Sequence, residues 1–172
     1  ASLEAAAQVE SELGWPQCAS ILLWSEDWHP GVLGIVASRM VERFQRPTLL
    51  VGLDGGRGRG SGRSLPGLDL TRVLDGCADL LESWGGHALA AGLVVARERL
   101  PELRARVEQL VHERLSPGDL VKRIPYDAPL ALGECDDTLV SWIERLAPHG
   151  LDNPEPVYHL AQADVESTSV VG

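Results

Sequence analysis

The sequence has 172 residues, with 25 acidic and 15 basic side chains and a formal net charge of -10. Its hydrophobic content of 44% is ordinary for a globular protein, and no apolar run approaches the roughly 20 residues that span a membrane. These features predict no membrane partner, and they exclude a nucleic-acid binder that relies on overall positive charge.

The acidic charge is concentrated near the C-terminus. Residues 127–172 hold nine acids and one base, whereas residues 1–126 hold sixteen acids and fourteen bases. Contact with nucleic acid would therefore need a local basic site. The three cysteines, Cys18, Cys77 and Cys135, are scattered and odd in number, and the first residues lack a secretory signal. This pattern predicts reduced thiols in a cytoplasmic protein.

Alternating helical and apolar segments predict an α/β domain in the first part of the chain. Residues 2–13 have the pattern of a helix, and residues 18–24 and 47–53 that of buried strands. Between these strands, residues 32–44 carry two i,i+4 rows of apolar side chains and predict an amphipathic helix.

A turn signal at Asp54-Gly55-Gly56 indicates that the Arg/Gly-rich run after it is the return strand of a hairpin. Asp69 is placed to cap a helix whose apolar spacing continues to Trp84, with Gly85 at its C-terminus. Residues 89–96 predict a strand, and residues 101–115 a helix. We therefore expect residues 17–118 to form a mixed β-sheet flanked by helices, preceded by the helix of residues 2–13.

The composition of the chain changes from residue 119 onward. Prolines interrupt this segment, and only one short helix is predicted, capped by Asp136 and with Leu139, Trp142, Ile143 and Leu146 turned inward. The run from residue 157 to 171 has room for one or two strands, too few for an independent sheet. We expect residues 119–172 to be a linker and the incomplete start of a second domain.

The run from Gly55 to Ser64 is the most distinctive feature of the chain. Glycines let a ligand approach the backbone closely, and arginine offers a planar fork of donors that fits phosphate oxygens. The side chains that would bind are Arg57, Arg59, Ser61, Arg63 and Ser64. From the residues alone, a phosphate site and a glycine-rich strand with solvated arginines are equally acceptable.

Two histidines are further candidates. In Gly85-Gly86-His87 the first glycine is explained as a helix cap, but a cap does not require Gly86 and His87. Because the neighbouring residues have no large side chains, the imidazole could reach a ligand. His29 lies at a strand-to-helix turn and has the same two explanations, structural or ligand-binding. No H-x-x-x-H or C-x-x-C spacing is present, so the sequence predicts no metal site.

Four stretches together resemble the RecJ family, the bacterial single-stranded-DNA-specific 5′→3′ exonucleases of the DHH phosphoesterase superfamily. The match runs in the right order along nearly the whole chain. The sequence differs from the usual family pattern at His149 and Asp152, which leaves the turn there to be settled by the structure. The four stretches are Trp28-His29-Pro30-Gly31-Val32-Leu33-Gly34-Ile35-Val36-Ala37-Ser38-Arg39, Gly60-Ser61-Gly62-Arg63-Ser64, Gly85-Gly86-His87 with Ala90-Ala91-Gly92, and Leu146-Ala147-Pro148 with Asn153-Pro154-Glu155-Pro156.

The resemblance implies that residues 1–16 are the end of a linker helix, residues 17–118 a DHH-associated domain, and residues 119–172 a linker and the start of an OB-fold. Mn²⁺ or Mg²⁺ would be held by a catalytic DHH domain upstream of residue 1 and would activate water for attack on the phosphodiester, so this chain alone should be inactive. Single-stranded DNA is the implied substrate, with a single-strand-binding protein and a helicase as partners in DNA repair and recombination, and the protein is expected to be a monomer.

By the same resemblance, each candidate residue receives a role. Catalysis would involve His87, which contacts a phosphate near the metal ions, and His29 would line the same cleft. The phosphate-binding set is Arg59, Ser61, Gly62, Arg63, Ser64, Gly85, Gly86 and His87.

Three alternatives remain at this point. One is a DHH-superfamily phosphodiesterase that degrades oligoribonucleotides or cyclic dinucleotides, which would share the Gly-Gly-His motif. The second is a non-catalytic nucleic-acid module like the C-terminal domain of alanyl-tRNA synthetase, and the third is a purely structural module.

Overall fold

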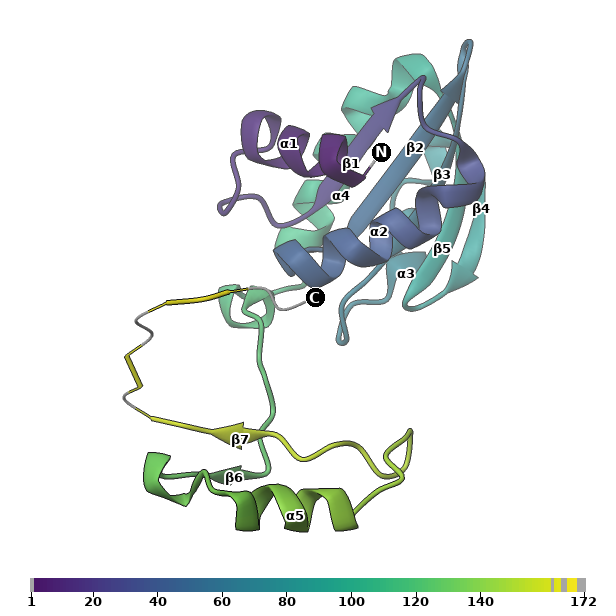
Figure 1. The fold of residues 1–172 in the computed structure, drawn as a ribbon. Helices are drawn as coiled ribbons and strands as arrows, with labels where there is room; N and C mark the ends of the chain where they lie inside the picture. The colour runs from purple at the N-terminus through teal and green to yellow at the C-terminus, as the bar shows by residue number, and fades with distance from the viewer. Residues whose placement is uncertain (1, 162, 165–166, 170–172) are drawn as a thin grey trace. The chain divides into compact units, whose positions relative to one another are not determined.

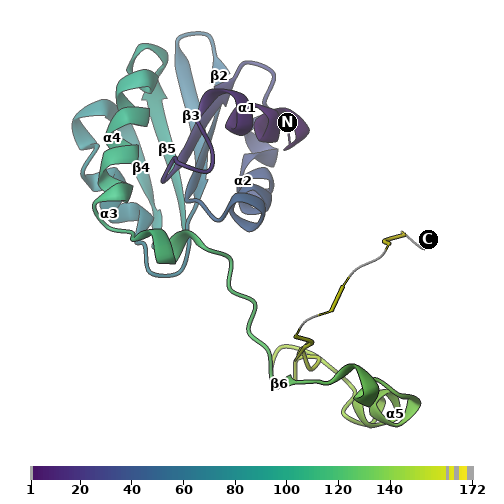
Figure 2. The ribbon, with the colours of Figure 1, turned by 90° about the vertical axis from the view of Figure 1, so that its left-hand side faces the viewer.

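The computed structural model describes residues 2–161, 163–164 and 167–169, and it divides into two compact units, Ala1–Lys122 and Arg123–Gly172. The first unit has a five-stranded mixed sheet in the order β1-β2-β3-β5-β4, with helices on both sides (Figures 1 and 2). Strands β1 and β2 are parallel and the other pairs antiparallel, which confirms the predicted mixed α/β class. In chain order the elements are α1 (Ser2–Glu12), β1 (Ile21–Ser25), α2 (Pro30–Phe44), β2 (Thr48–Asp54), β3 (Arg57–Arg63), α3 (Leu70–Asp75), η1 (Ala78–Leu80), β4 (Leu81–His87), β5 (Ala90–Ala96), η2 (Arg97–Arg99), α4 (Leu100–His112) and η3 (Pro117–Leu120).

The sheet separates two hydrophobic cores. Successive strand residues point to opposite faces, so Leu50 of β2 packs with α1 and α2, while Leu49 and Val51 pack with α3 and α4. Figure 2 shows α1 and α2 on one side of the sheet and α3 and α4 on the other. Helix α1 packs on the first unit, where its Ala5 and Val9 are completely buried.

A buried arginine holds three backbone segments of the first unit together. Arg46 is 7% exposed, and its guanidinium donates to the carbonyls of Pro16 at 2.7 Å, Cys18 at 2.6 Å and Leu120 at 2.9 Å. These bonds bring three distant backbone segments together, and carbonyl oxygens satisfy the buried cation. The compact unit therefore continues to Lys122, beyond the expected boundary at residue 118.

The helix predicted from Asp69 to Trp84 is wrong beyond its first two turns. Asp69 does cap α3, accepting from the amides of Thr71 and Arg72, but the helix ends at Asp75. The chain then turns through η1 and enters β4, so Gly85 lies within a strand and is not a helix cap. The apolar spacing of this segment is compatible with a helix or a strand, and its pairing with β5 makes it a strand.

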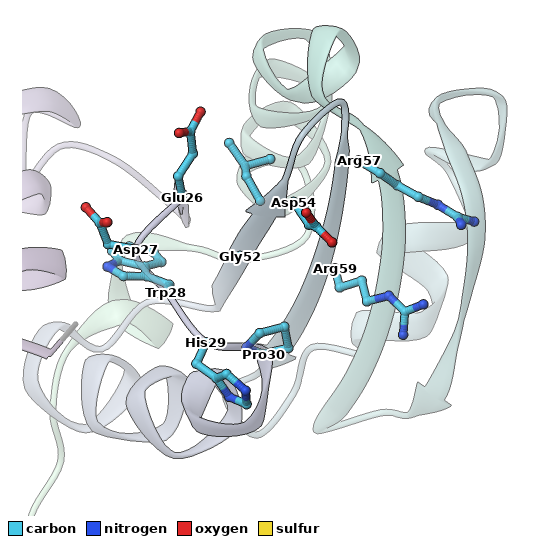
Figure 3. A pocket seen from close by; sticks show the side chains of 10 residues that line it. Glu26, Asp27, Trp28, His29, Pro30, Gly52, Asp54, Arg57 and Arg59 are labelled. Carbon is cyan, nitrogen blue, oxygen red and sulfur yellow. The ribbon is translucent and has the colours of Figure 1, made fainter.

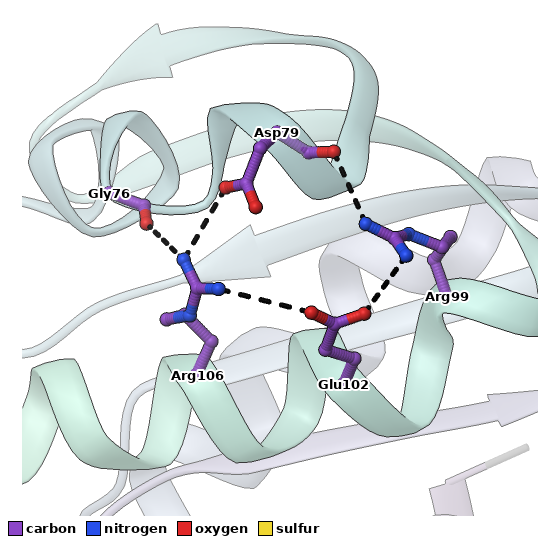
Figure 4. A network of polar contacts seen from close by, with 5 residues as sticks. All are labelled: Gly76, Asp79, Arg99, Glu102 and Arg106. Atoms are coloured by element: carbon purple, nitrogen blue, oxygen red, sulfur yellow. Dashed lines mark hydrogen bonds and ion pairs between the residues drawn. The ribbon is translucent and has the colours of Figure 1, made fainter.

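A polar network holds the start of β4 in place (Figure 4). Arg106 of α4 donates to Asp79 Oδ1 and to the Gly76 carbonyl, both at 3.3 Å, and also contacts Glu102 at 3.9 Å. Glu102 in turn pairs with Arg99 at 3.0 Å. The network ties η1 to α4 immediately before β4 begins.

The second unit has little regular structure among its described residues. It contains β6 (Ala128–Pro129), η4 (Leu132–Glu134), α5 (Asp137–Arg145) and β7 (Tyr158–His159), with β6 and β7 paired in parallel. The Asp136 carboxylate accepts from the Leu139 amide at 2.9 Å, which confirms the predicted cap of α5.

The predicted inward face of α5 is wrong within the described residues. Trp142 is 56% and Leu146 53% exposed, and Leu139 and Ile143 are only partly covered. An amphipathic pattern marks which side chains could be buried, but burial also needs a neighbouring element to pack on them.

The turn that contains His149 and Asp152 is closed by hydrogen bonds. Gly150 and Asn153 exchange backbone hydrogen bonds of 2.8 and 3.2 Å, and the Asn153 amide donates to the carbonyls of Leu146 and Pro148. Of the strands predicted after residue 156, the described part contains only β7; residues 162, 165–166 and 170–172 lie outside it. Among the described helices, none is both long and apolar enough to cross a membrane.

Candidate nucleic-acid interface

The Arg/Gly run forms strand β3, and its alternation separates glycines from arginines. Gly58, Gly60 and Gly62 face the core under α3 and α4, where a Cβ on Gly62 would lie 2.5 Å from Leu49 Cδ2 and 2.7 Å from Leu70 Cδ2. These glycines are needed because the core leaves no room for a side chain. The three glycines therefore pack against leucine and valine side chains of the core.

The other face of β3 presents Arg57, Arg59, Ser61 and Arg63. Arg63 is half-buried, and its Nη1 donates to the Gly62 carbonyl at 2.8 Å and to Ser61 Oγ at 3.3 Å. These bonds hold the guanidinium against α2 at Gly34, where an added Cβ would meet Arg63 Nη2 at 2.8 Å.

Small residues extend this face across β5 and β4. Residues in register share a face of the sheet, and the pairings place Arg63, Ala90 and His87 in one row and Ser61, Gly92 and Gly85 in the next. The backbones of the first and last residue in a row are two strand spacings apart, about 10 Å. We call this surface the open face, and it consists of Arg57, Arg59, Ser61, Arg63, Ser83, Gly85, His87, Ala90, Gly92 and Val94.

The open face has a shallow hollow of about 380 Å³, lined in part by Arg59, Ser83, Gly85 and Gly92. Gly92 and Gly85 are exposed, and a Cβ on Gly85 would meet nothing within 4 Å. The floor is thus built of backbone and small side chains. A polymer with a charged backbone could lie close to it.

Gly86 has a structural role. Its φ is +149°, and an added Cβ would lie 2.3 Å from the Ala90 carbonyl oxygen and 2.6 Å from Ala91 Cα. Only glycine fits this conformation and contact. Gly86 therefore shapes the tight β4–β5 hairpin that presents His87, whose side chain is exposed.

Ser64 lies apart from the other candidates. It is 8% exposed, its hydroxyl donates to the Leu68 carbonyl at 2.9 Å, and its amide donates to the Leu89 carbonyl. Both donors are used within the fold, so the structure does not bring Ser64 to the open face.

His29 lines a separate pocket of about 670 Å³ at the carboxyl ends of β1 and β2 (Figure 3). The histidine caps α2, with Nδ1 accepting from the Gly31 amide at 3.1 Å, and its side chain is exposed. Arg59 lines both this pocket and the hollow of the open face. The pocket beside His29 and the hollow of the open face therefore share Arg59.

Two residues of the site were not among the sequence candidates as binding residues. Gly34 is a helix-interior glycine, which usually indicates close packing, and here it admits Arg63 and Ser61. Gly92 alternates with the buried Ala91 and Leu93. That period of two could have placed Gly92 on the exposed side of its strand.

The described residues do not offer a metal site. No three His, Cys, Asp or Glu side chains gather closely enough in the part of the chain that the structure describes. The donor set therefore does not fit Mn²⁺ or Mg²⁺, and the binding derived below does not involve a metal ion.

Comparison with known proteins matches both units. The DHHA1 domain family matches residues 16–113, and the RecJ OB domain family matches residues 126–172. The single-stranded-DNA-specific exonuclease RecJ of Bacillus subtilis is 34% identical over 171 residues, which are 98% of this chain and 22% of that protein. The RecJ of Escherichia coli is 34% identical over 143 residues, which are 80% of this chain and 25% of that protein.

Solved structures agree. The crystal structure of RecJ from Thermus thermophilus in complex with Mn²⁺ has a TM-score of 0.70 and 33% identity, over 91% of this chain and 23% of that one. The same protein has been solved in complex with Mg²⁺. The chain thus spans about a quarter of the length of the relatives it matches. Two matching domain families in order, together with this fold, show that the chain belongs to the RecJ family.

Proposed function

We propose that this chain is the substrate-binding part of a single-stranded-DNA 5′→3′ exonuclease, a hydrolase of phosphodiester bonds. One observation carries the proposal: in an acidic chain, Arg59 and Arg63 stand on an open face without an ion pair to any described carboxylate. Arginine left unpaired beside a floor of glycine and alanine suits a phosphate backbone. The match of residues 126–172 to the RecJ OB domain favours this function over an oligoribonucleotide phosphodiesterase.

Every candidate except Ser64 has a role in this proposal. Arg59 and Arg63 bind phosphates, Ser61 adds a hydroxyl, and His87 approaches a phosphate from the far strand. Gly85 keeps the floor low, while Gly62 and Gly86 maintain the strands beneath it. His29 lines the adjoining pocket near Arg59.

The test is the affinity for a fluorescently labelled oligothymidylate, measured by anisotropy over a series of salt concentrations. Two phosphate contacts predict a slope of log K against log salt of about -1.4, from roughly 0.7 per contact on single strands. Arg63→Ala should weaken binding and reduce the slope by about 0.7. Arg114→Ala removes an exposed arginine just after α4, on the opposite side of the sheet, and serves as the matched control. Equal affinities of the Arg63→Ala protein and the wild type would reject the site.

The chain alone is expected to show no nuclease activity, including in the presence of Mn²⁺. We propose that Mn²⁺ or Mg²⁺ is held by a DHH domain outside the present sequence. If purified protein degraded DNA and His87→Ala abolished that degradation, the catalytic centre would lie in this chain and the division of roles would be wrong.

We further propose a cytoplasmic, monomeric protein that acts in DNA repair and recombination with a single-strand-binding protein and a helicase. The three free cysteines, of which Cys18 and Cys77 are buried, agree with a reducing compartment. Light scattering after size exclusion would test the monomeric state.

A further inference from the structure

The three arginines on the open side of β3 are not equivalent. Arg57 Nη2 lies 2.5 Å from Glu82 Oε2, so its charge is paired. Arg59 and Arg63 form no ion pair with any carboxylate among the described residues. Unpaired positive charge is therefore concentrated toward the Arg63 end of the strand.

An irregularity in β4 brings Glu82 to Arg57. The pairing with β5 shifts between Leu81 and Ser83, so Glu82 is the extra residue of a β-bulge. On β5 the partner of Arg57 is Ala96, a small residue over which the two long side chains can meet. Such bulges redirect side chains, and this one places a carboxylate beside the first arginine of the run.

A second ion pair occupies the same end of the face. Arg97 of η2 pairs with Glu26 of the β1–α2 connection, and the Arg97 amide donates to the Gly56 carbonyl at 2.9 Å. The pair therefore lies beside the β2–β3 turn that precedes Arg57. Both arginines at this end are neutralised.

We propose that Glu82 sets one limit of the DNA track on the open face by neutralising Arg57. The inference rests on the proposed function. A phosphate at Arg57 would also face the Glu82 carboxylate, and like charges repel. The pair is exposed on both sides, 56% and 42%, and exposed pairs add little to folding stability. Its effect is thus on where phosphates bind, and among the arginines of β3 the phosphate contacts are confined to Arg59 and Arg63.

The experiment is the same salt series with Glu82→Gln, Arg57→Gln and the double variant. Glu82→Gln releases Arg57, so the slope should steepen by about 0.7 and the affinity at low salt should rise about threefold. Arg57→Gln alone should leave the slope unchanged, and in the double variant it should cancel the gain. Glu98→Gln, which removes an exposed acid with no ion pair among the described residues, should leave the slope unchanged.

A gain that persists in the double variant or equals that of Glu98→Gln would show a general charge effect and overturn the proposal. A loss of slope in Arg57→Gln equal to that in Arg63→Ala would show that Arg57 already binds DNA. Glu82→Ala provides a second variant if Glu82→Gln fails to fold. If the wild type binds through Arg63 and Glu82→Gln changes nothing, only this inference fails. No binding by the wild type at low salt would reject the proposed function and this inference together.

Discussion

The two faces of the β3–β5–β4 region are built from the same strands, but glycine has a different role on each face. On the core side, Gly62 is required because a side chain would meet Leu49 and Leu70 within 3 Å. In the β4–β5 hairpin, Gly86 is required because a side chain would meet the Ala90 carbonyl oxygen at 2.3 Å. On the open side, a Cβ on Gly85 would meet nothing within 4 Å, and one on Gly92 would make only an ordinary contact of 3.7 Å with the Gly60 carbonyl oxygen. Glycine is thus a packing requirement on one face and a means of exposing backbone on the other.

The largest expected effect comes from comparing Gly86→Ala with Gly85→Ala. At Gly86 the methyl would lie 2.3 Å from a carbonyl oxygen at a φ of +149°, so we expect a loss of about 3 kcal/mol or more in the free energy of unfolding. The neighbouring Gly85→Ala should change it by less than about 0.5 kcal/mol. Urea denaturation of both variants measures the difference, and similar losses would contradict the close backbone contact assigned to Gly86 and the open position assigned to Gly85.

A smaller effect is expected for Gly62→Ala against Gly92→Ala. The methyl on Gly62 would overpack the core against the leucine side chains of β2 and α3, at a cost of about 1–3 kcal/mol. A methyl on Gly92 would meet only the Gly60 carbonyl oxygen at 3.7 Å, so stability should change by less than about 0.5 kcal/mol. Thermal melts compare the two variants, and equal melting temperatures would show that the core side tolerates side chains.

The smallest effect concerns a thiol on the core side. Burial raises the pKa of Cys77 from 9.0 to about 11, so the folded state holds the proton more tightly than the unfolded state. Its contribution to stability is complete below pH 9 and declines as the pH rises toward 11, by at most about 1.4 kcal/mol per pH unit.

Unfolding in urea between pH 8 and 10.5 measures this decline. Cys77→Ala should make it shallower, whereas Cys135→Ala should leave it unchanged, because Cys135 is exposed. The same slope in both variants would mean that the Cys77 thiol titrates normally in the folded protein.

Much of the fold was predictable from local patterns. The amphipathic helix after His29, the β2–β3 hairpin and the caps Asp69 and Asp136 each depend on residues close in sequence, and each is confirmed. Strand β4 was missed because Leu81 and Trp84 continue a helical spacing. Its identity depends on pairing with β5, which a local pattern does not contain.

The candidate site shows the same division. The sequence marked Arg59, Ser61, Arg63 and His87 by residue type, and the register places them on one face. It also marked Ser64, whose hydroxyl the structure directs to the Leu68 carbonyl. Such internal hydrogen bonds depend on how the chain turns after β3, and residue type alone does not reveal them.

By itself, the sequence determined the alternation of glycine and arginine in β3. With a period of two, this alternation places the arginines on one face of the strand and glycines on the other. Only the tertiary structure decided which arginines remain available. Arg57 is paired by Glu82, which is 25 positions away in the sequence and comes within 2.5 Å through a bulge in another strand. Charge is a property of each residue, but its compensation depends on distances that only the folded sheet sets.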